Sequence, residues 1–228
     1  MSDTHFQENS GKEVLSFLSF LQMVEKKGDG LFLLGDIFDF YFEYKSFIPK
    51  NFFDVFYALR RIVEQGIHVH YWTGNHDFWV GEFFKRLGIK THAEPTTLKM
   101  EGKRILVLHG DEVDTNFMLK NILCNKFSKF LFSLLHPEFG LLIARVVSKL
   151  SREKSKKFEL PKRSLENFAE RKFLKGIDTV IMGHFHIPYF YKRGKKNLVI
   201  CGDWGSWHSY GVIENGNISL KRFSHSPK

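Results

Sequence analysis

An α/β fold is predicted for this sequence by two features of its pattern. Short apolar segments typical of buried strands alternate with segments of helical periodicity, and polar side chains follow several of these strands at once. The clearest strand is the apolar run Leu-Phe-Leu-Leu at 31–34, which is followed by Gly35 and Asp36. Open α/β sheets build their sites at the carboxyl ends of their strands, so Asp36 is the first candidate for chemistry.

Length and composition favour one domain spanning residues 1–228. The chain has 228 residues and is 43% hydrophobic, which is enough to bury a full core. Its two cysteines, Cys124 and Cys201, form no CxxC pair, so we expect a cytoplasmic protein without disulfides or a thiolate zinc site. No apolar run approaches the roughly 20 residues that span a bilayer, and residues 1–10 are too polar for a signal peptide.

Three helices are predicted in the first half of the chain. A capping-box pattern from Ser10 to Glu13 precedes apolar residues at helical spacing, and this helix should end near Gly28. The segments 52–65 and 83–87 give a second helix and a short third one, each stopped by a glycine.

Further strands are predicted from apolar runs, at 67–73, 179–182 and 197–201. Two hairpins are also expected. The first joins 96–100 to 104–108, and the second joins 210–214 to 218–223. Asn215 and Gly216 in the second hairpin suit a type I′ turn.

Polar side chains of metal-binding types follow these strands or the start of the chain. They are Asp3, His5, Asp36, Asn75, His76, His109, His184 and His186. Such a mixture of carboxylate, amide and imidazole suits Mn²⁺, Fe²⁺ or Zn²⁺ better than Ca²⁺. One tetrahedral ion does not use so many ligands, and a carboxylate can bridge two ions. Two ions about 4 Å apart are the arrangement that clamps a phosphoryl group for attack.

Positive charge is concentrated in one segment. Residues 112–176 contain 14 Lys and Arg against 7 Asp and Glu, in a chain whose net charge is +9. An anionic partner is indicated, whether nucleic acid, acidic lipid headgroups or a phosphorylated substrate, although a solvated helical face gives the same pattern. Phenylalanine and leucine interleave with these lysines, which favours a lipid–water interface over nucleic acid.

In this order, the motifs resemble those of the calcineurin-like metallophosphoesterases. They are Asp3-Thr4-His5, Gly35-Asp36, Gly74-Asn75-His76-Asp77, His109 and Gly183-His184-Phe185-His186. The resemblance implies a β-sandwich flanked by helices, an αββα arrangement. It also implies one metal held by Asp3, His5, Asp36 and His186, and a second held by Asp36, Asn75, His109 and His184. Asp36 and His76 would be the catalytic residues, with His76 stabilising phosphoryl charge or protonating the leaving oxygen.

Several segments are similar to those of the UDP-2,3-diacylglucosamine diphosphatases of lipid A biosynthesis. They are GDIFDFYFEYK, HGDE, LHPEFGL, SREKSKKF and CGDW. This resemblance implies a helical lid at 116–176 and hydrolysis of a pyrophosphate to UMP and 2,3-diacylglucosamine 1-phosphate. It implies two divalent ions, with Mn²⁺ favoured, and a nucleotide-linked lipid as the partner. The substrate would contact Asn75, His76, Ser151, Arg152, Lys157 and His184.

The same resemblance places the protein on the inner face of the inner membrane, as a peripheral protein without a nucleic-acid partner. Two alternatives stay open: a general phosphodiesterase or nuclease, and a non-catalytic scaffold. The family's first strand should precede Asp3, but only two residues do so here. We therefore expect a sheet without that strand, with Asp3 and His5 in a frayed terminus.

Overall fold

The computed structural model describes residues 1–7, 10–113, 126–137, 139–140, 142–143 and 159–224. The helices are α1 (Gly11–Lys27), α2 (Phe53–Glu64), α3 (Glu82–Arg86), α5 (Lys126–Ser133) and α7 (Lys162–Leu174), with 3-10 turns at Lys50–Phe52 and Asp111–Val113. The strands are β1 (Gly30–Leu33), β2 (His68–Trp72), β3 (Lys90–His92), β4 (Thr96–Met100), β5 (Lys103–Val107), β6 (Thr179–Met182), β7 (Tyr189–Arg193), β8 (Lys196–Ile200), β9 (Ser209–Glu214) and β10 (Asn217–Arg222).

Two main sheets carry the strand ends. In the first, β1, β2 and β3 pair in parallel in that order. In the second, the order is β4-β5-β6-β8-β7, where the central pairs β5–β6 and β6–β8 are parallel and the outer pairs are antiparallel. The hairpin β9–β10 forms a separate pair. Because β1, β2, β5 and β6 end at the same side of the molecule, the polar residues after them are brought together.

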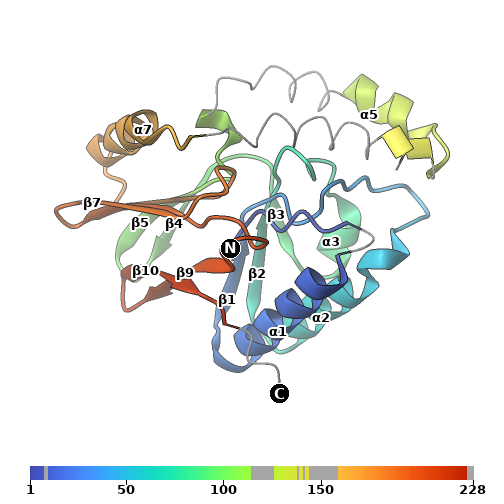
Figure 1. The fold of residues 1–228 in the computed structure, drawn as a ribbon, viewed down its shortest axis with the longest axis horizontal. Helices are drawn as coiled ribbons and strands as arrows, with labels where there is room; N and C mark the ends of the chain where they lie inside the picture. Colours follow the sequence, from blue (N-terminus) through green and yellow to red (C-terminus); the bar gives the residue numbers. More distant parts are fainter. Residues whose placement is uncertain (8–9, 114–125, 138, 141, 144–158, 225–228) are drawn as a thin grey trace.

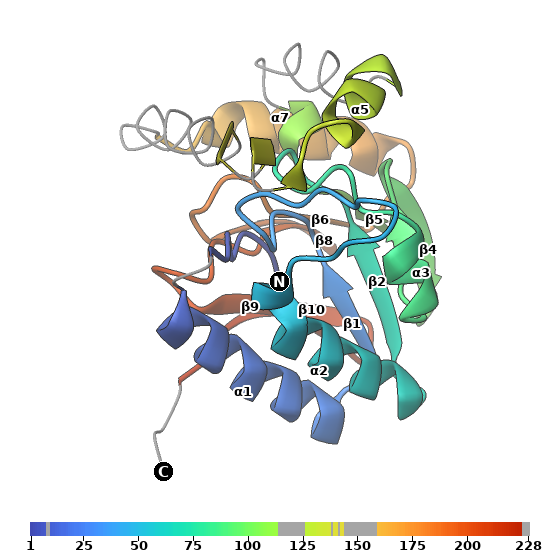
Figure 2. The same cartoon turned by 90° about the vertical axis from the view of Figure 1, so that its right-hand side faces the viewer.

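Three hydrophobic clusters show how the layers stack. One joins α1 and α2 to the first sheet, through residues such as Phe17, Leu59 and Val69. A second lies between the sheets and includes Trp72 and Ile181. A third joins α7 to the second sheet. The order is therefore helix, sheet, sheet, helix, which Figures 1 and 2 show with α1 and α2 on the side opposite α7, and the predicted αββα fold is confirmed.

Helix α7 has a different place from the one that its sequence suggested. It falls within residues 116–176, the range predicted as a lid. Leu165, Ala169 and Phe173 instead make it the outer layer on the second sheet, because these three side chains recur every four residues and form one buried stripe. Helix α7 therefore packs on the layered core. Residues 116–125 and 144–158 of the predicted lid lie outside the described residues, so the lid stays a prediction.

Most predicted elements are present within one or two residues of their expected ends. The type I′ turn is supported, because Asn215 and Gly216 both have positive φ, at 50° and 68°. Two details differ. Strands β3 and β7 were not predicted. The capping box is wrong, because Ser10 makes no side-chain cap and its Oγ accepts a bond from the Gln7 N–H instead.

The first residues run beside the end of β1 and are not frayed. Met1 is buried, its ammonium donates to the Phe32 carbonyl, and its carbonyl accepts from the Leu34 N–H. Asp3 and His5 continue this ladder by donating to the carbonyls of Gly35 and Asp36. In the described residues, no assigned strand pairs with β1 on this side, and this backbone ladder of the first residues occupies that edge. None of the described helices has the length and apolar character needed to cross a bilayer.

Candidate metal centre

Asp36 lies at the centre of the clustered polar residues. It lies three residues after the end of β1 and is buried. Its Oδ2 lies 3.4 Å from Nε2 of His109 and 3.9 Å from Nε2 of His5, and its Oδ1 accepts a hydrogen bond from the His76 N–H at 2.9 Å. One carboxylate oxygen thus faces imidazoles from two different sides, which is the position that a bridging ligand requires.

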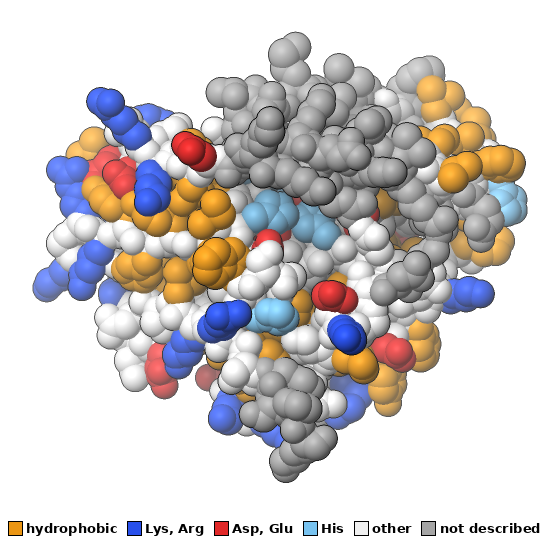
Figure 3. All heavy atoms as spheres, in the orientation of Figure 1, with side chains coloured by type: hydrophobic (Ala, Val, Ile, Leu, Met, Phe, Trp, Pro, Cys, Tyr) orange, Lys and Arg blue, Asp and Glu red, His pale blue; other side chains and the backbone are white. Residues whose placement is uncertain are grey.

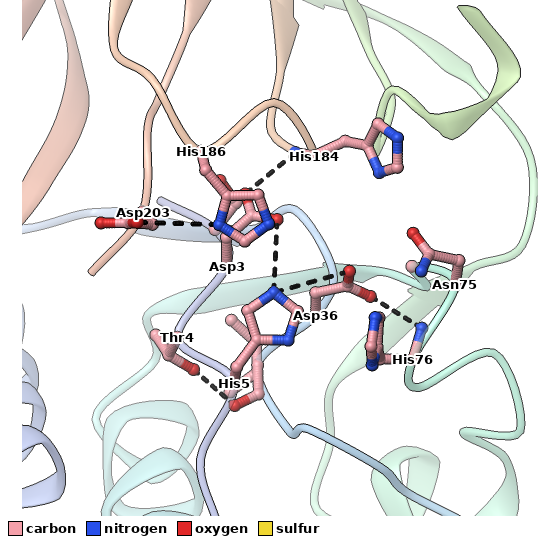
Figure 4. A network of polar contacts seen from close by, with 12 residues as sticks. Asp3, Thr4, His5, Asp36, Asn75, His76, His184, His186 and Asp203 are labelled. Atoms are coloured by element: carbon pink, nitrogen blue, oxygen red, sulfur yellow. Dashed lines mark hydrogen bonds and ion pairs between the residues drawn. The ribbon is translucent and has the colours of Figure 1, made fainter. Parts of the chain in front are cut away.

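The first group of side chains consists of Asp3, His5 and His186, whose ligand atoms lie within 4.8 Å of one another. Nε2 of His5 is 4.0 Å from Oδ1 of Asp3, and the rings of His5 and His186 stack with centroids 5.0 Å apart. Figure 4 shows these residues converging beside Asp36. Oδ1 of Asp3 and both ring nitrogens of His5 are buried without a hydrogen-bond partner among the described residues.

The second group consists of Asp36, His109 and His184, again with ligand atoms within 4.8 Å. Asn75 belongs beside it, because its Oδ1 lies 3.3 Å from Nε2 of His109. The two groups are linked by the backbone N–H of His184, which donates to Oδ2 of Asp3 at 2.9 Å. All seven predicted ligands are thus close together, while histidine side chains gather with acidic atoms near the middle of one face (Figure 3).

The predicted metals fit this donor set. Buried polar atoms that lack a hydrogen-bond partner are rare because leaving them unpaired costs free energy, and here they belong to a carboxylate and an imidazole. A divalent cation would satisfy both. The chemistry that such ions supply is neutralisation of phosphoryl charge and activation of water.

Five of the seven predicted ligands have left-handed backbone conformations. The φ angles of Asp3, His5, Asp36, His184 and His186 lie between 45° and 68°. Non-glycine residues adopt this region rarely, and they do so mainly where the surrounding structure enforces it at functional sites. Here the strained residues are those that turn side chains from the strand ends toward a common point.

Close backbone approach explains one glycine of the motifs. A Cβ on Gly74 would collide with the carboxylate of Asp36 and with its backbone nitrogen. Only glycine lets the loop after β2 pass this close to the loop after β1, so Gly74 sets the spacing between Asp36 and Asn75.

Backbone carbonyls orient two of the histidines. Nδ1 of His109 is 2.6 Å from the Leu34 carbonyl, and Nδ1 of His76 is 2.9 Å from the Asp39 carbonyl. A carbonyl only accepts, so each Nδ1 carries the proton. Nε2 of His109 is then left to face Asp36 and Asn75, as metal-binding histidines require. In His76, the Asp39 carbonyl contacts Nδ1 and not Nε2.

Charge within the cluster shifts several pKa values. Burial lowers the pKa of His5 well below its ordinary value, so this ring is neutral and able to ligate. Burial also lowers the pKa of His109, but the Asp36 carboxylate outweighs it and holds that pKa well above the ordinary value. A proton thus occupies the place beside Asp36 in the metal-free protein, and a bound cation would replace it. At His186, burial lowers the pKa, while the carboxylates of Asp203, Asp3 and Asp36 raise it. The carboxylates prevail, and the pKa of His186 rises to about 9.

Three acidic residues of the site were missed by sequence reasoning. Asp77 is fully buried and accepts from the N–H groups of Ile37 and Gly74 and from the Tyr71 hydroxyl. Asp39 groups with His5 and His76, and Asp203 lies beside His186. Asp77 stands within a quoted motif and could have been found from it. Asp39 and Asp203 stand within the quoted segments GDIFDFYFEYK and CGDW, but nothing in those segments shows that their partners are His5, His76 and His186, which come from elsewhere in the sequence.

The predicted substrate contacts divide into two sets. Asn75, His76 and His184 are in the cluster described above. Ser151, Arg152 and Lys157 lie outside the described residues, so their predicted role stays a prediction.

The fold and the clustered carboxylate, amide and imidazole groups define a metal-dependent phosphoesterase. The chain belongs to the calcineurin-like phosphoesterase family, whose model matches residues 1–188. This confirms the resemblance stated from the motifs, and the family implies divalent metal ions at the site.

The chain is also similar in sequence to curated proteins over most of its length. The chain is 25% identical over 227 residues to a UDP-2,3-diacylglucosamine hydrolase of Porphyromonas gingivalis, covering 89% of this chain and 87% of the relative. It is 28% identical over 242 residues to a UDP-2,3-diacylglucosamine hydrolase of Hahella chejuensis, covering 96% and 94%. A solved archaeal phosphodiesterase is 12% identical, with a TM-score of 0.49 and coverage of 97% and 96%.

Proposed function

We propose that this protein is a dinuclear metal hydrolase that cleaves the pyrophosphate of UDP-2,3-diacylglucosamine. The products would be UMP and 2,3-diacylglucosamine 1-phosphate, as in lipid A biosynthesis. The observation that carries the proposal is the position of Asp36, whose Oδ2 lies 3.9 Å from Nε2 of His5 and 3.4 Å from Nε2 of His109. The substrate class is supported by the names and the near-complete coverage of the curated relatives.

The proposed ligand sets follow the two groups of side chains. Asp3, His5, Asp36 and His186 would hold one ion, and Asp36, Asn75, His109 and His184 the other. Mn²⁺ is the proposed metal, with Fe²⁺ or Zn²⁺ as alternatives, because the donors mix oxygen with imidazole nitrogen. Metal analysis of the purified protein would identify the ion and its stoichiometry.

His76 is the proposed acid at this site. Its Nδ1–H is held by the Asp39 carbonyl and its backbone N–H by Asp36. These two contacts fix the ring between the ligand Asn75 and the ligand His5, whose ring centroid lies 4.7 Å from that of His76. In its imidazolium form, with a second proton on Nε2, the ring would protonate the leaving phosphate oxygen, or stabilise charge that develops on the phosphoryl group.

Contact with a membrane surface is part of the proposal, since the substrate is a lipid. Helices α5 and α7 lie on the same side of the molecule, opposite α1 and α2 (Figures 1 and 2). Phe130, Leu131 and Leu134 in and after α5 are exposed, and α7 carries exposed Lys162, Arg163 and Arg171. Apolar and basic side chains together suit an anionic lipid interface. We propose that the protein acts as a peripheral protein on the cytoplasmic face of the inner membrane.

One assay tests the activity. The protein is incubated with Mn²⁺ and UDP-2,3-diacylglucosamine, beside reactions with a chromogenic phosphodiester and with single-stranded DNA, and UMP release is followed. Asp178→Asn serves as a control variant, because this half-buried residue precedes β6 at the end opposite His184. UMP from the lipid substrate alone is the expected result. Turnover of the other substrates without UMP release would favour a general phosphodiesterase or nuclease, and no turnover with a full metal complement would favour a scaffold.

A further inference from the structure

A carboxylate of the CGDW segment, outside the predicted metal-ligand motifs, lies beside the exposed ligand candidate His186. Asp203 follows β8, and its Oδ2 is 3.7 Å from Nδ1 of His186. In Figure 4, Asp203 stands to the left of the His186 ring, while His5 lies below the ring. The carboxylate is therefore next to the ring nitrogen that points away from the cluster.

Asp203 is itself held in place by its surroundings. Its Oδ1 accepts from the backbone N–H groups of Ser206 at 2.7 Å and Trp207 at 3.2 Å. Its own backbone N–H donates to the His186 carbonyl at 3.1 Å. Since Oδ1 is used by the turn that follows, Oδ2 is the atom left to face His186, and the two residues are joined through backbone and side chain alike.

His186 needs such a partner more than the other histidines do. Its side chain is 42% exposed, whereas that of His109 is 1% exposed and packed on all sides. Nδ1 of His109 and Nδ1 of His76 each donate to a backbone carbonyl. For His186, the corresponding acceptor among the described residues is Asp203, whose Oδ2 lies at an ion-pair distance of 3.7 Å from Nδ1.

We propose that Asp203 is a positioning residue for the metal centre. By accepting from Nδ1–H of His186, it selects the tautomer with a free Nε2 and keeps that nitrogen directed at Asp3 and His5. Carboxylates in this role raise the basicity of the imidazole and fix its orientation. The inference rests on the proposed metal site, and its consequence is selective: it concerns the ion held by Asp3, His5 and His186.

Asp203→Asn is the sharpest test. The amide oxygen would keep the bonds from Ser206 and Trp207, which places the amide NH₂ where Oδ2 was, facing His186. A donor there favours a proton on Nε2 of His186, the tautomer that cannot ligate through this nitrogen. Protein stripped of metal with a chelator is titrated with Mn²⁺ in a calorimeter. We expect one of the two Mn²⁺ affinities to fall by about 10- to 100-fold. The other affinity and the unfolding midpoint of the metal-free protein should stay the same.

Asp178→Asn is the matched control, because that carboxylate also accepts a backbone N–H, from Arg104, at the far end of β6. If Asp203→Asn lowers the midpoint of the metal-free protein, Asp203→Ser replaces it, since serine can cap the same turn and presents nothing to His186. Unchanged Mn²⁺ binding overturns the inference, and so does destabilisation in both variants, which would show a structural role. If the wild-type protein did not bind two metal ions, the proposed function would be overturned instead.

Discussion

The structure predicts how much stability the protein loses when the carboxylate of Asp77 is removed. Its buried carboxylate joins the loop after β1 to the loop after β2, since Oδ2 accepts from the Ile37 N–H at 2.9 Å and Oδ1 from the Gly74 N–H at 2.8 Å. The Tyr71 hydroxyl is a third donor. Burial and the nearby Asp36 raise the pKa of Asp77 to about 6, so at pH 8 the group is ionised.

Asp77→Ala leaves these three buried donors without their acceptor. A hydrogen bond to a charged group contributes about 1.5–3 kcal/mol, and an orphaned buried donor costs about 1–3 kcal/mol. Water entering the vacated space satisfies some of the donors, so we expect a loss of about 3–5 kcal/mol. That is a large part of the 5–15 kcal/mol by which domains are usually stable. Tyr71→Phe removes a single donor and should cost about 1–2 kcal/mol.

The assay is urea denaturation of the metal-free protein at pH 8, followed by tryptophan fluorescence. Asp178→Ala is the control, because its carboxylate accepts a bond from one backbone N–H, that of Arg104. A loss for Asp77→Ala within about 1 kcal/mol of that for Tyr71→Phe would refute the idea that Asp77 braces the two ligand loops.

Three further predictions concern the site and the fold. Asp36→Ala should abolish hydrolysis and lower metal content at both positions, measured by elemental analysis, and retained turnover would contradict the bridging role. His76→Ala should keep the metal content and slow the chemical step by about 10²- to 10⁴-fold in single-turnover kinetics, and loss of metal would make this residue structural. His70→Phe tests pH dependence: burial, His92 and Lys90 lower the pKa of His70 to about 4, so the unfolded chain takes up a proton that the folded one does not. Stability is therefore lost as pH falls from about 6.5 toward 4, and the variant should lose less stability between pH 7.5 and 5 in urea denaturation than the wild type; an equal loss would be evidence against this assignment.

The membrane contact is tested separately from catalysis. Sedimentation with vesicles rich in anionic lipid should recover the protein, and vesicles of neutral lipid should recover less at the same salt concentration. The triple change Lys162, Arg163 and Arg171 to Glu should weaken recovery and leave the metal content unchanged. Equal recovery of the variant would exclude α7 as the basic contact.

Local pattern was sufficient for the layered fold and for most of the site. The strands that deliver Asp36, Asn75, His109 and His184 are short apolar runs followed by glycine or polar residues, and this signal needs no knowledge of the partner strands. The type I′ turn at Asn215-Gly216 was predictable for the same reason, because two residues that tolerate positive φ determine it. The spacing of the motifs along the chain was sufficient to indicate the protein family.

Tertiary structure decided the features that depend on distant residues. Strand β7 was not predicted although it begins with Tyr-Phe-Tyr, because no residue in it is fully buried and it ends in Lys-Arg; it is held by pairing with β8. The buried stripe of α7 reads like any amphipathic helix, so its face against the second sheet could not be told from a lid. The contact between Asp203 and His186 and the left-handed backbone of Asp3, His5, Asp36, His184 and His186 have no local signal. Sequence specified which side chains were available, and only packing of the two sheets fixed which nitrogen or oxygen each one turns toward the centre.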